Sequence, residues 1–159
     1  MQNKIATHPE KFSNIKTIQI NITDAVDGCI QKIQKCIDLN ILNSNYLLST
    51  IKVETKAEIF NWKGYETYSE ENSTFDLIIG ADVLFFRNYH KDLADTINSL
   101  LGKSTSRNSS HLFRAVIMAP DRDFTLSKFL QIFEEFYGTK CEVTVEELGN
   151  IKGFEEQFR

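Results

Sequence analysis

The segment Phe75–Phe86, FDLIIGADVLFF, constrains the fold of this chain more than any other. Its apolar run Leu77–Ile79 is too short for a globular helix and lies between Asp76 and Gly80, so it predicts a strand that is buried on both faces. Asp82 follows the predicted carboxyl end of this strand. Open α/β sheets bind their ligands at that end of their strands, so this segment is the first candidate for a functional site.

Asp82 itself has two interpretations. Aspartate is a favourable N-cap, so Asp82 could begin a helix at Val83 and have no further role. Alternatively, its carboxylate belongs to a catalytic or binding site at the end of the sheet. A carboxylate after a strand is more often a cap than a catalytic group, so the spacing alone favours the first interpretation.

The rest of the chain alternates between the apolar periods of strands and of helices. Residues 1–14 form a polar N-terminal arm, and residues 15–159 are expected to form one partial domain. The predicted strands cover residues 18–24, 51–59, 77–81, 115–119 and 141–145, and the predicted helices cover 25–39, 93–102, 126–138 and a region around Phe154 and Phe158. Residues 63–74 are predicted to be a loop. This order favours an α/β fold with a mostly parallel, doubly wound sheet.

Composition and motifs exclude several classes of function. The formal net charge of -4 and the pI near 5.4 give no basic surface for nucleic acid. We find no signal peptide and no apolar stretch of membrane length, which predicts no membrane association and a cytoplasmic or nuclear protein. The three cysteines and three histidines do not pair at metal-ligand spacing, so no metal site is expected.

Four segments together resemble a known family. They are INITDAVDGCIQKIQKCI, the FNW that ends at Trp62, FDLIIGADVLFFRNYHKDLADTINSLL, and VIMAPDRDFTLSKFLQIFEEF. The chain resembles the class I S-adenosylmethionine-dependent methyltransferases, in the branch of seven-β-strand protein-lysine methyltransferases, from about Ile15 to Phe158. Many members of that branch have tyrosine where this chain has Phe85, and the calmodulin-lysine methyltransferases resemble this chain in having phenylalanine there.

The resemblance implies a cofactor and two groups of site residues. S-adenosylmethionine is the implied cofactor, and Asp24 aligns with the acidic residue whose carboxylate accepts hydrogen bonds from its ribose hydroxyls. Trp62, after the polar residue Asn61, would provide a flat apolar wall for the adenine. The remaining positions implied for the site are Ala25 and Ala81 beside the cofactor and Asp82 and Phe85 at the catalytic centre.

Structural interpretations of the same residues remain open. Trp62 could be only the largest core residue, and Asp24 could be only a cap for the helix that begins at Ala25. Each structural interpretation is about as good as the functional one when a residue is taken alone. The functional interpretation gains from the conjunction of all these residues in the right order.

The resemblance also implies elements that this sequence lacks. The family's first strand and its glycine-rich cofactor loop should precede the Asp24 strand, but residues 1–14 contain no glycine, and a final strand is missing as well. We therefore expect a truncated Rossmann-like sheet in which S-adenosylmethionine binding is weakened or lost. The missing strand would lie between the Asp24 strand and the Phe75 strand. These two strands would then pair directly, capture the arm, or borrow a strand from another copy in a homodimer.

Several functions follow as hypotheses. The first is methylation of a lysine in a protein substrate, for which the resemblance suggests calmodulin, with doubtful activity in this chain alone. The alternative is a non-catalytic methyltransferase-like module that completes its sheet with a partner or by dimerisation. A methyltransferase of small molecules or RNA is another alternative. An unrelated nucleotide-binding α/β protein has no glycine fingerprint to support it.

Overall fold

A computed structural model describes six segments of the chain, namely residues 15–43, 51–71, 75–102, 114–120, 122–138 and 142–146. The chain divides into two compact units, Met1–Gly64 and Tyr65–Arg159, and each is described by itself. The predicted arm at 1–14 and the predicted helix around Phe154 and Phe158 lie outside the described residues. That residues 15–159 form one partial domain stays a prediction.

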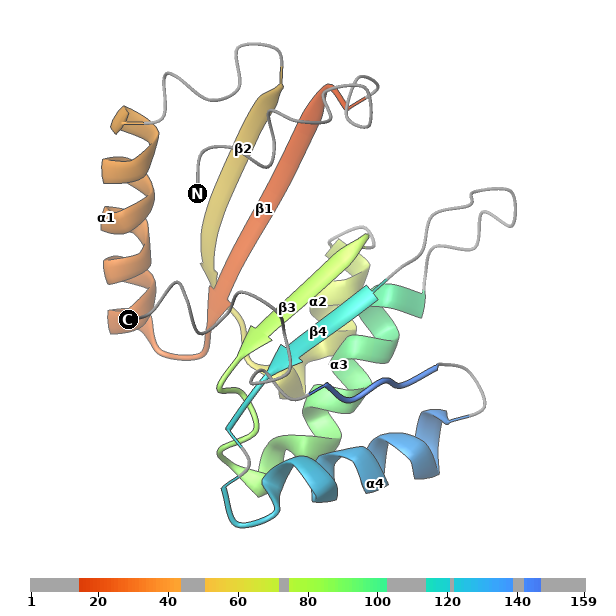
Figure 1. Ribbon diagram of the computed structural model, residues 1–159. Coiled ribbons are helices and arrows are strands. Elements are labelled where there is room, and N and C mark those ends of the chain that lie inside the picture. Colours follow the sequence, from red (N-terminus) through yellow and green to blue (C-terminus); the bar gives the residue numbers. More distant parts are fainter. Residues whose placement is uncertain are drawn as a thin grey trace. The chain divides into compact units, whose positions relative to one another are not determined.

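The first unit is a parallel β-α-β arrangement. Strand β1 covers Thr17–Asp24, helix α1 covers Asp27–Asn43, and strand β2 covers Lys52–Ile59. The two strands pair in parallel from Thr17 opposite Lys52 to Asp24 opposite Ile59. Parallel neighbours need a crossover connection, and α1 provides it while contacting both strands (Figure 1).

Side chains alternate across the β1–β2 sheet as the two-residue period predicts. On one face Gln19 Nε2 donates a hydrogen bond to Glu54 Oε2 at 3.2 Å, and Lys56 forms an ion pair with Glu58. The isoleucines at 18, 20 and 22 alternate with these residues along β1 and lie on the opposite face. The predicted strands at 18–24 and 51–59 are therefore confirmed.

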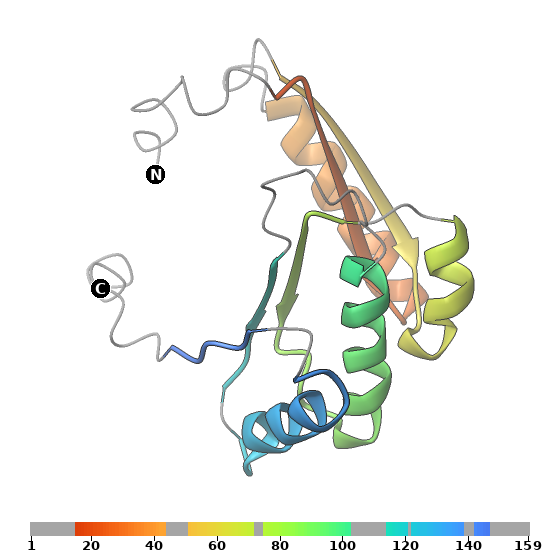
Figure 2. The ribbon, with the colours of Figure 1, turned by 90° about the vertical axis from the view of Figure 1, so that its right-hand side faces the viewer.

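The second unit repeats the alternation of helices and strands. Its elements are α2 (Tyr65–Glu71), β3 (Leu77–Ala81), α3 (His90–Gly102), β4 (Arg114–Met118) and α4 (Thr125–Tyr137). Strands β3 and β4 pair in parallel from Leu77 opposite Arg114 to Ala81 opposite Met118. Figure 2 shows α3 beside these two strands, and α3 contacts both of them as well as α2 and α4.

The core of the second unit lies between α3 and α4. Amphipathic spacing brings the apolar side chains of both helices to their shared side, where the buried residues are Leu93, Ala94, Ile97 and Leu100 of α3 and Phe129 and Phe133 of α4. The rings of Phe129 and Phe133 lie 5.9 Å apart between centroids. The aromatic stripe of α4 therefore belongs to the core.

Two predicted elements were wrong. The predicted loop at 63–74 contains α2, a short helix whose Tyr68 is buried. The polar composition of this segment gave no helical pattern of apolar residues from which the helix could be predicted. The strand predicted at 141–145 is irregular at residues 142–145, and Cys141 lies outside the described residues, so the alternating polarity has no pairing partner among the described residues.

The burial of β3 also differs from the prediction. On one face of the β3–β4 sheet, Ile78 is half-buried and Gly80 is buried. On the other face, Leu77 is 51% exposed and Ile79 is 62% exposed. Val116 and Met118 of β4, opposite Ile79 and Ala81, are also exposed. One face of this sheet is therefore covered, and its other face is apolar and open in the part of the chain that the structure describes.

The α/β class and the parallel pairing of strands are confirmed. The described strands form two two-stranded sheets, in the orders β1-β2 and β3-β4. Among the described strands, each therefore has one edge without a partner strand in its own unit. The alternation of helices with parallel strands is that of a Rossmann-like fold.

Candidate functional site

The loop that follows β3 is held in an uncommon backbone conformation. Asp82 has a φ of 54°, in the left-handed region that few residues other than glycine adopt. Its amide donates a hydrogen bond to the carbonyl of Met118 on β4 at 2.7 Å. No helix begins at Val83, because α3 begins at His90 after a 3-10 turn at Arg87–Tyr89. The interpretation of Asp82 as the N-cap of a helix is therefore wrong.

Two buried residues hold the loop against the second unit. Leu84 and His90 are each 1% exposed, and His90 Nε2 is hydrogen-bonded to the carbonyl oxygen of Leu84 at 2.9 Å. The His90 ring also meets Phe129 of α4 edge-on, with centroids 5.6 Å apart. As a result, the loop is fixed at Leu84 while the next two residues, Phe85 and Phe86, remain largely exposed.

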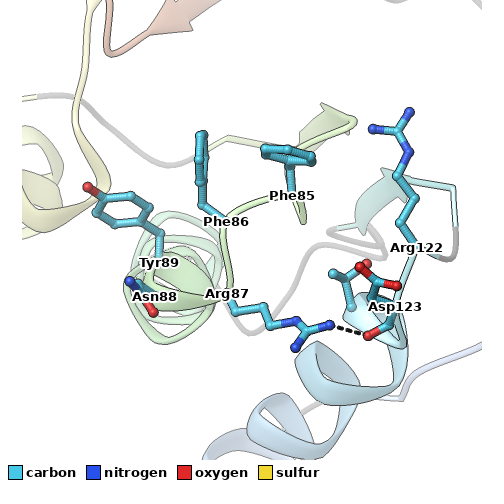
Figure 3. A pocket seen from close by; sticks show the side chains of 8 residues that line it. Phe85, Phe86, Arg87, Asn88, Tyr89, Arg122 and Asp123 are labelled. Carbon is cyan, nitrogen blue, oxygen red and sulfur yellow. Dashed lines mark hydrogen bonds between the residues drawn. The ribbon is translucent and has the colours of Figure 1, made fainter.

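A cavity of about 420 Å³ opens beside this loop (Figure 3). It is lined by side chains from the loops after β3 and β4, and these are Phe85, Phe86, Arg87, Asn88, Tyr89, Arg122, Asp123 and Thr125. The carboxyl ends of β3 and β4 meet at one edge of their sheet because the strands are parallel. The cavity therefore lies where an α/β sheet is expected to bind its ligand.

Three aromatic rings form one side of the cavity. Phe85 and Phe86 meet edge-to-face, with centroids 4.8 Å apart and planes at 82°. The rings of Phe86 and Tyr89 also meet edge-to-face, with their centroids 6.2 Å apart and their planes at 89°. Perpendicular rings present both faces and edges to the space between them, and aromatic faces attract ammonium groups. This wall can accept the apolar stem and the cationic head of a lysine.

Two arginines join the loops after β3 and β4 in opposite directions. Arg122 Nη1, after β4, lies 3.5 Å from Asp82 Oδ2, after β3. Arg87, after β3, donates a hydrogen bond to the backbone carbonyl of Asp123, after β4 (Figure 3). Asp123 and Phe124 also have positive φ values, of 49° and 59°. Strained residues of this kind cluster at functional sites.

The second unit thus brings three predicted site residues together. Ala81 ends β3 opposite Met118, Asp82 follows it, and Phe85 lines the cavity. Sequence reasoning missed Arg87 and Arg122, which line the cavity in the same way. Arg122 lies in the PDRDF segment just after the second apolar strand, and that position was the signal that could have identified it.

The first unit brings the other predicted residues together at the carboxyl ends of β1 and β2. Asp24 Oδ1 accepts a hydrogen bond from the amide of Val26 at 2.8 Å, and the carbonyl of Asp24 accepts one from the amide of Phe60 at 3.0 Å. Asp24 therefore caps the approach to α1, which begins at Asp27 rather than Ala25. A carboxylate has further acceptor positions, so this capping leaves room for a ligand hydroxyl.

The Asn61–Trp62 pair forms a turn after β2. Asn61 Oδ1 accepts a hydrogen bond from the amide of Lys63 at 3.1 Å, and the Asn61 carbonyl accepts one from the amide of Gly64 at 2.8 Å. Trp62 is half-buried, whereas the neighbouring Phe60 is 7% exposed. Phe60 is therefore the buried core residue of this segment, and Trp62 is less buried than Phe60.

These residues fit the adenosine half of S-adenosylmethionine. Asp24 offers carboxylate oxygen to hydroxyl donors, Trp62 offers an apolar ring, and Ala25 beside Asp24 is small and exposed. Among the described residues, no three histidine, cysteine or acidic side chains are grouped as a metal site would need. The described helices include none that is long and apolar enough to cross a membrane.

Comparison with known proteins places this geometry in a family. A family model described as lysine methyltransferase matches residues 5–136, which is most of the chain. The chain is also 36% identical over 76 residues to calmodulin-lysine N-methyltransferase of Arabidopsis thaliana. That match covers 48% of this chain and 23% of the relative, so the chain spans less than a quarter of that relative's length in the match. The family model spans most of the chain, including the residues that line the cavity, and this chain therefore belongs to the lysine methyltransferase family.

Proposed function

We propose that this chain carries the lysine-binding part of an S-adenosylmethionine-dependent protein-lysine N-methyltransferase. The observation that carries this proposal is the aromatic cavity beside Asp82 at the carboxyl end of β3. Family membership supports methyl transfer to lysine in general. The roles of the individual residues are part of the proposal.

Each group of residues has a distinct task in this proposal. In the first unit, Asp24, Ala25, Asn61 and Trp62 would contact the cofactor, which supplies an electrophilic methyl group when bound. Phe85 and Phe86 would hold the lysine stem and exclude water from its amine. The amine must lose a proton before it can act as a nucleophile, and its reference pKa is about 10.4. Apolar walls favour the neutral amine, because burial disfavours the charged form.

Asp82 would orient the amine from the edge of the cavity. Its carboxylate does not line the cavity directly, but it is paired with Arg122, which does. A carboxylate accepts hydrogen bonds from an ammonium or amine, so Asp82 can fix the direction of the nitrogen lone pair. The same carboxylate pairs with Arg122, so holding the loop is the alternative role for Asp82.

The substrate in this proposal is a protein, and calmodulin is the first one to test. The relative's name supports that choice. A cytoplasmic or nuclear location for the protein is part of the same proposal. No nucleic acid or membrane partner is proposed.

A labelled-methyl assay tests this function. The chain would be incubated with S-adenosylmethionine carrying a labelled methyl group and with calmodulin, bulk protein or RNA in turn. We expect label in protein, on lysine, and a loss of at least about tenfold with Phe85→Ala. Phe136→Ala, which removes an exposed phenylalanine outside the cavity, is the matched control. Label in RNA alone would contradict the proposal.

A non-catalytic interaction module is the second candidate function. The specific observation that favours it is the open apolar face formed by Leu77, Ile79, Val116 and Met118. Parallel sheets are normally covered on both faces, so this face and the unpaired strand edges would be covered by a partner or a second copy. Light scattering would reveal a dimer, and calorimetry with S-adenosylmethionine that gives no heat would favour this candidate over the enzyme.

A further inference from the structure

We propose that the cavity selects a lysine that has a carboxylate side chain next to it in the substrate, and that Arg87 binds this carboxylate. This inference rests on the proposed lysine site and adds the chemical class of its substrate. It is carried by the charges that line the same cavity as the aromatic wall.

Arg87 and the acidic residue Asp123 line the same cavity, and the contact between them goes to the Asp123 backbone rather than to its carboxylate. The Arg87 guanidinium donates to the backbone carbonyl of Asp123, which holds the side chain in place without cancelling its charge. No carboxylate among the described residues forms an ion pair with it. A guanidinium has five N–H donors, so most remain for a ligand after this bond. A preorganised arginine suits a carboxylate, which it can bind with two parallel hydrogen bonds.

Arg122 and Asp82 form the complementary half of the site. Their closest atoms are 3.5 Å apart, well beyond the usual 2.7–2.9 Å of a charged hydrogen bond, and their side chains are 55% and 54% exposed. An exposed pair of this kind contributes at most about 1 kcal/mol. A substrate ammonium can therefore turn Asp82 away from Arg122 at little cost, while Arg122 stays at the rim to attract acidic residues.

The aromatic wall lines the same cavity as Arg87 and Arg122. Phe85, Phe86 and Tyr89 offer apolar surface to the lysine stem, and Figure 3 shows Arg87 reaching from the same loop toward Asp123. The cavity of about 420 Å³ is within the usual range for sites that bind small groups, so it suits one or two side chains rather than a folded domain. The aromatic residues would contact the lysine stem, and Arg87 would contact a carboxylate next to that lysine.

Peptide binding without cofactor tests the inference. Three peptides of equal length would be titrated by NMR: one with glutamate on both sides of a central lysine, one with glutamine there, and one with the glutamates moved to the peptide ends. The third peptide has the net charge of the first, so it separates local pairing from general attraction. We expect the first peptide to bind about tenfold more tightly than either of the others.

Two variants of Arg87 test whether this residue causes the preference for the first peptide. Arg87→Gln should reduce the preference for the first peptide to less than about twofold, and Arg87→Lys should restore part of it because the charge returns. Arg114→Gln is the matched control, because Arg114 is exposed and lies at the amino end of β4, away from the cavity. Circular dichroism spectra would establish that each variant is folded.

The outcomes separate this inference from the proposed function. Equal binding of the three peptides, no binding of any of them at millimolar concentration, or equal losses in Arg87→Gln and Arg114→Gln would each overturn it. A clear preference without methyl transfer would leave the inference standing and count against the enzyme. Methyl transfer that ignores neighbouring carboxylates would support the enzyme and overturn the inference.

Discussion

Oδ2 of Asp82 lies 3.5 Å from Nη1 of Arg122, and this ion pair joins the loop after β3 to the loop after β4. The amide of Asp82 is bonded to the carbonyl of Met118 in the same region, so both the backbone and the side chain of Asp82 connect these loops. Asp82 therefore connects two loops through non-covalent contacts, and it does not begin a helix.

Replacing Asp82 by asparagine should reduce methyl transfer far more than stability. Asparagine tolerates a φ of 54°, so the backbone can stay as it is while the charge is lost. We expect a loss of 10²–10⁴-fold in the labelled-methyl assay if Asp82 orients the amine, and a change of less than about 1 kcal/mol in the free energy of unfolding. Asp38→Asn on α1 is the control. Equal rates in both variants would assign Asp82 a purely structural role.

Replacing Gly80 by alanine should destabilise the second unit. An added Cβ would lie 2.9 Å from Cδ1 of Ile117 and 2.9 Å from Cγ2 of Val83, so these side chains must move. Overpacking of this kind costs about 1–3 kcal/mol. Gly28→Ala is the matched control, since its Cβ meets nothing within 4 Å and alanine favours helix α1 by about 1 kcal/mol. In urea unfolding, the free energy of unfolding should fall for Gly80→Ala and rise for Gly28→Ala. An unchanged free energy of unfolding for Gly80→Ala would contradict the packing argument.

Replacing His90 by alanine should loosen the loop that carries Phe85. The substitution removes the bond to the buried Leu84 carbonyl and the contact with Phe129, and it leaves a cavity. We expect a loss of about 3 kcal/mol in the free energy of unfolding. Asn88→Ala, at an exposed position in the same segment, should change stability by less than about 0.5 kcal/mol. Hydrogen exchange at Leu84 and Phe85 would be expected to rise only in the His90 variant.

The second unit should lose stability in alkaline solution. Burial and a hydrogen bond to Asp95 raise the pKa of Tyr137 above its ordinary value of 10.0, and a hydrogen bond to Asp95 raises the pKa of Lys91 above 10.5. Both groups bind protons more tightly when folded, so their contribution is present below pH 10 and is lost as pH rises through the raised values.

A single variant tests this pH dependence. Tyr137→Phe keeps the ring beside Phe133, whose centroid is 5.5 Å away, and removes the titrating hydroxyl. The fall in the thermal midpoint between about pH 9 and pH 11 should therefore be smaller in the variant. An unchanged slope would exclude Tyr137 as a source of the alkaline loss.

Local pattern predicted much of the fold. The alternation of Ile18, Ile20 and Ile22 predicted β1, and the helical spacing of Leu93, Ile97 and Leu100 predicted α3, because these periods reflect which side of a regular element is covered. The sequence pattern did not predict the elements whose structure depends on strand pairing or on packing against other elements. Tyr68 makes α2 part of the core despite its polar neighbours, and the alternation at 142–146 finds no partner among the described strands.

The class of fold, the lysine methyltransferase resemblance, and the positions of Asp24, Trp62, Asp82 and Phe85 after their strands could all be predicted from the amino-acid sequence, because local periodicity and motif order are properties of the chain. The left-handed conformation of Asp82, its pairing with Arg122, and the contact of Arg87 with the carbonyl of Asp123 could be seen only in the folded protein. These contacts join residues about 40 positions apart, and they depend on the parallel pairing of β3 with β4, which brings two loops to one edge of the sheet.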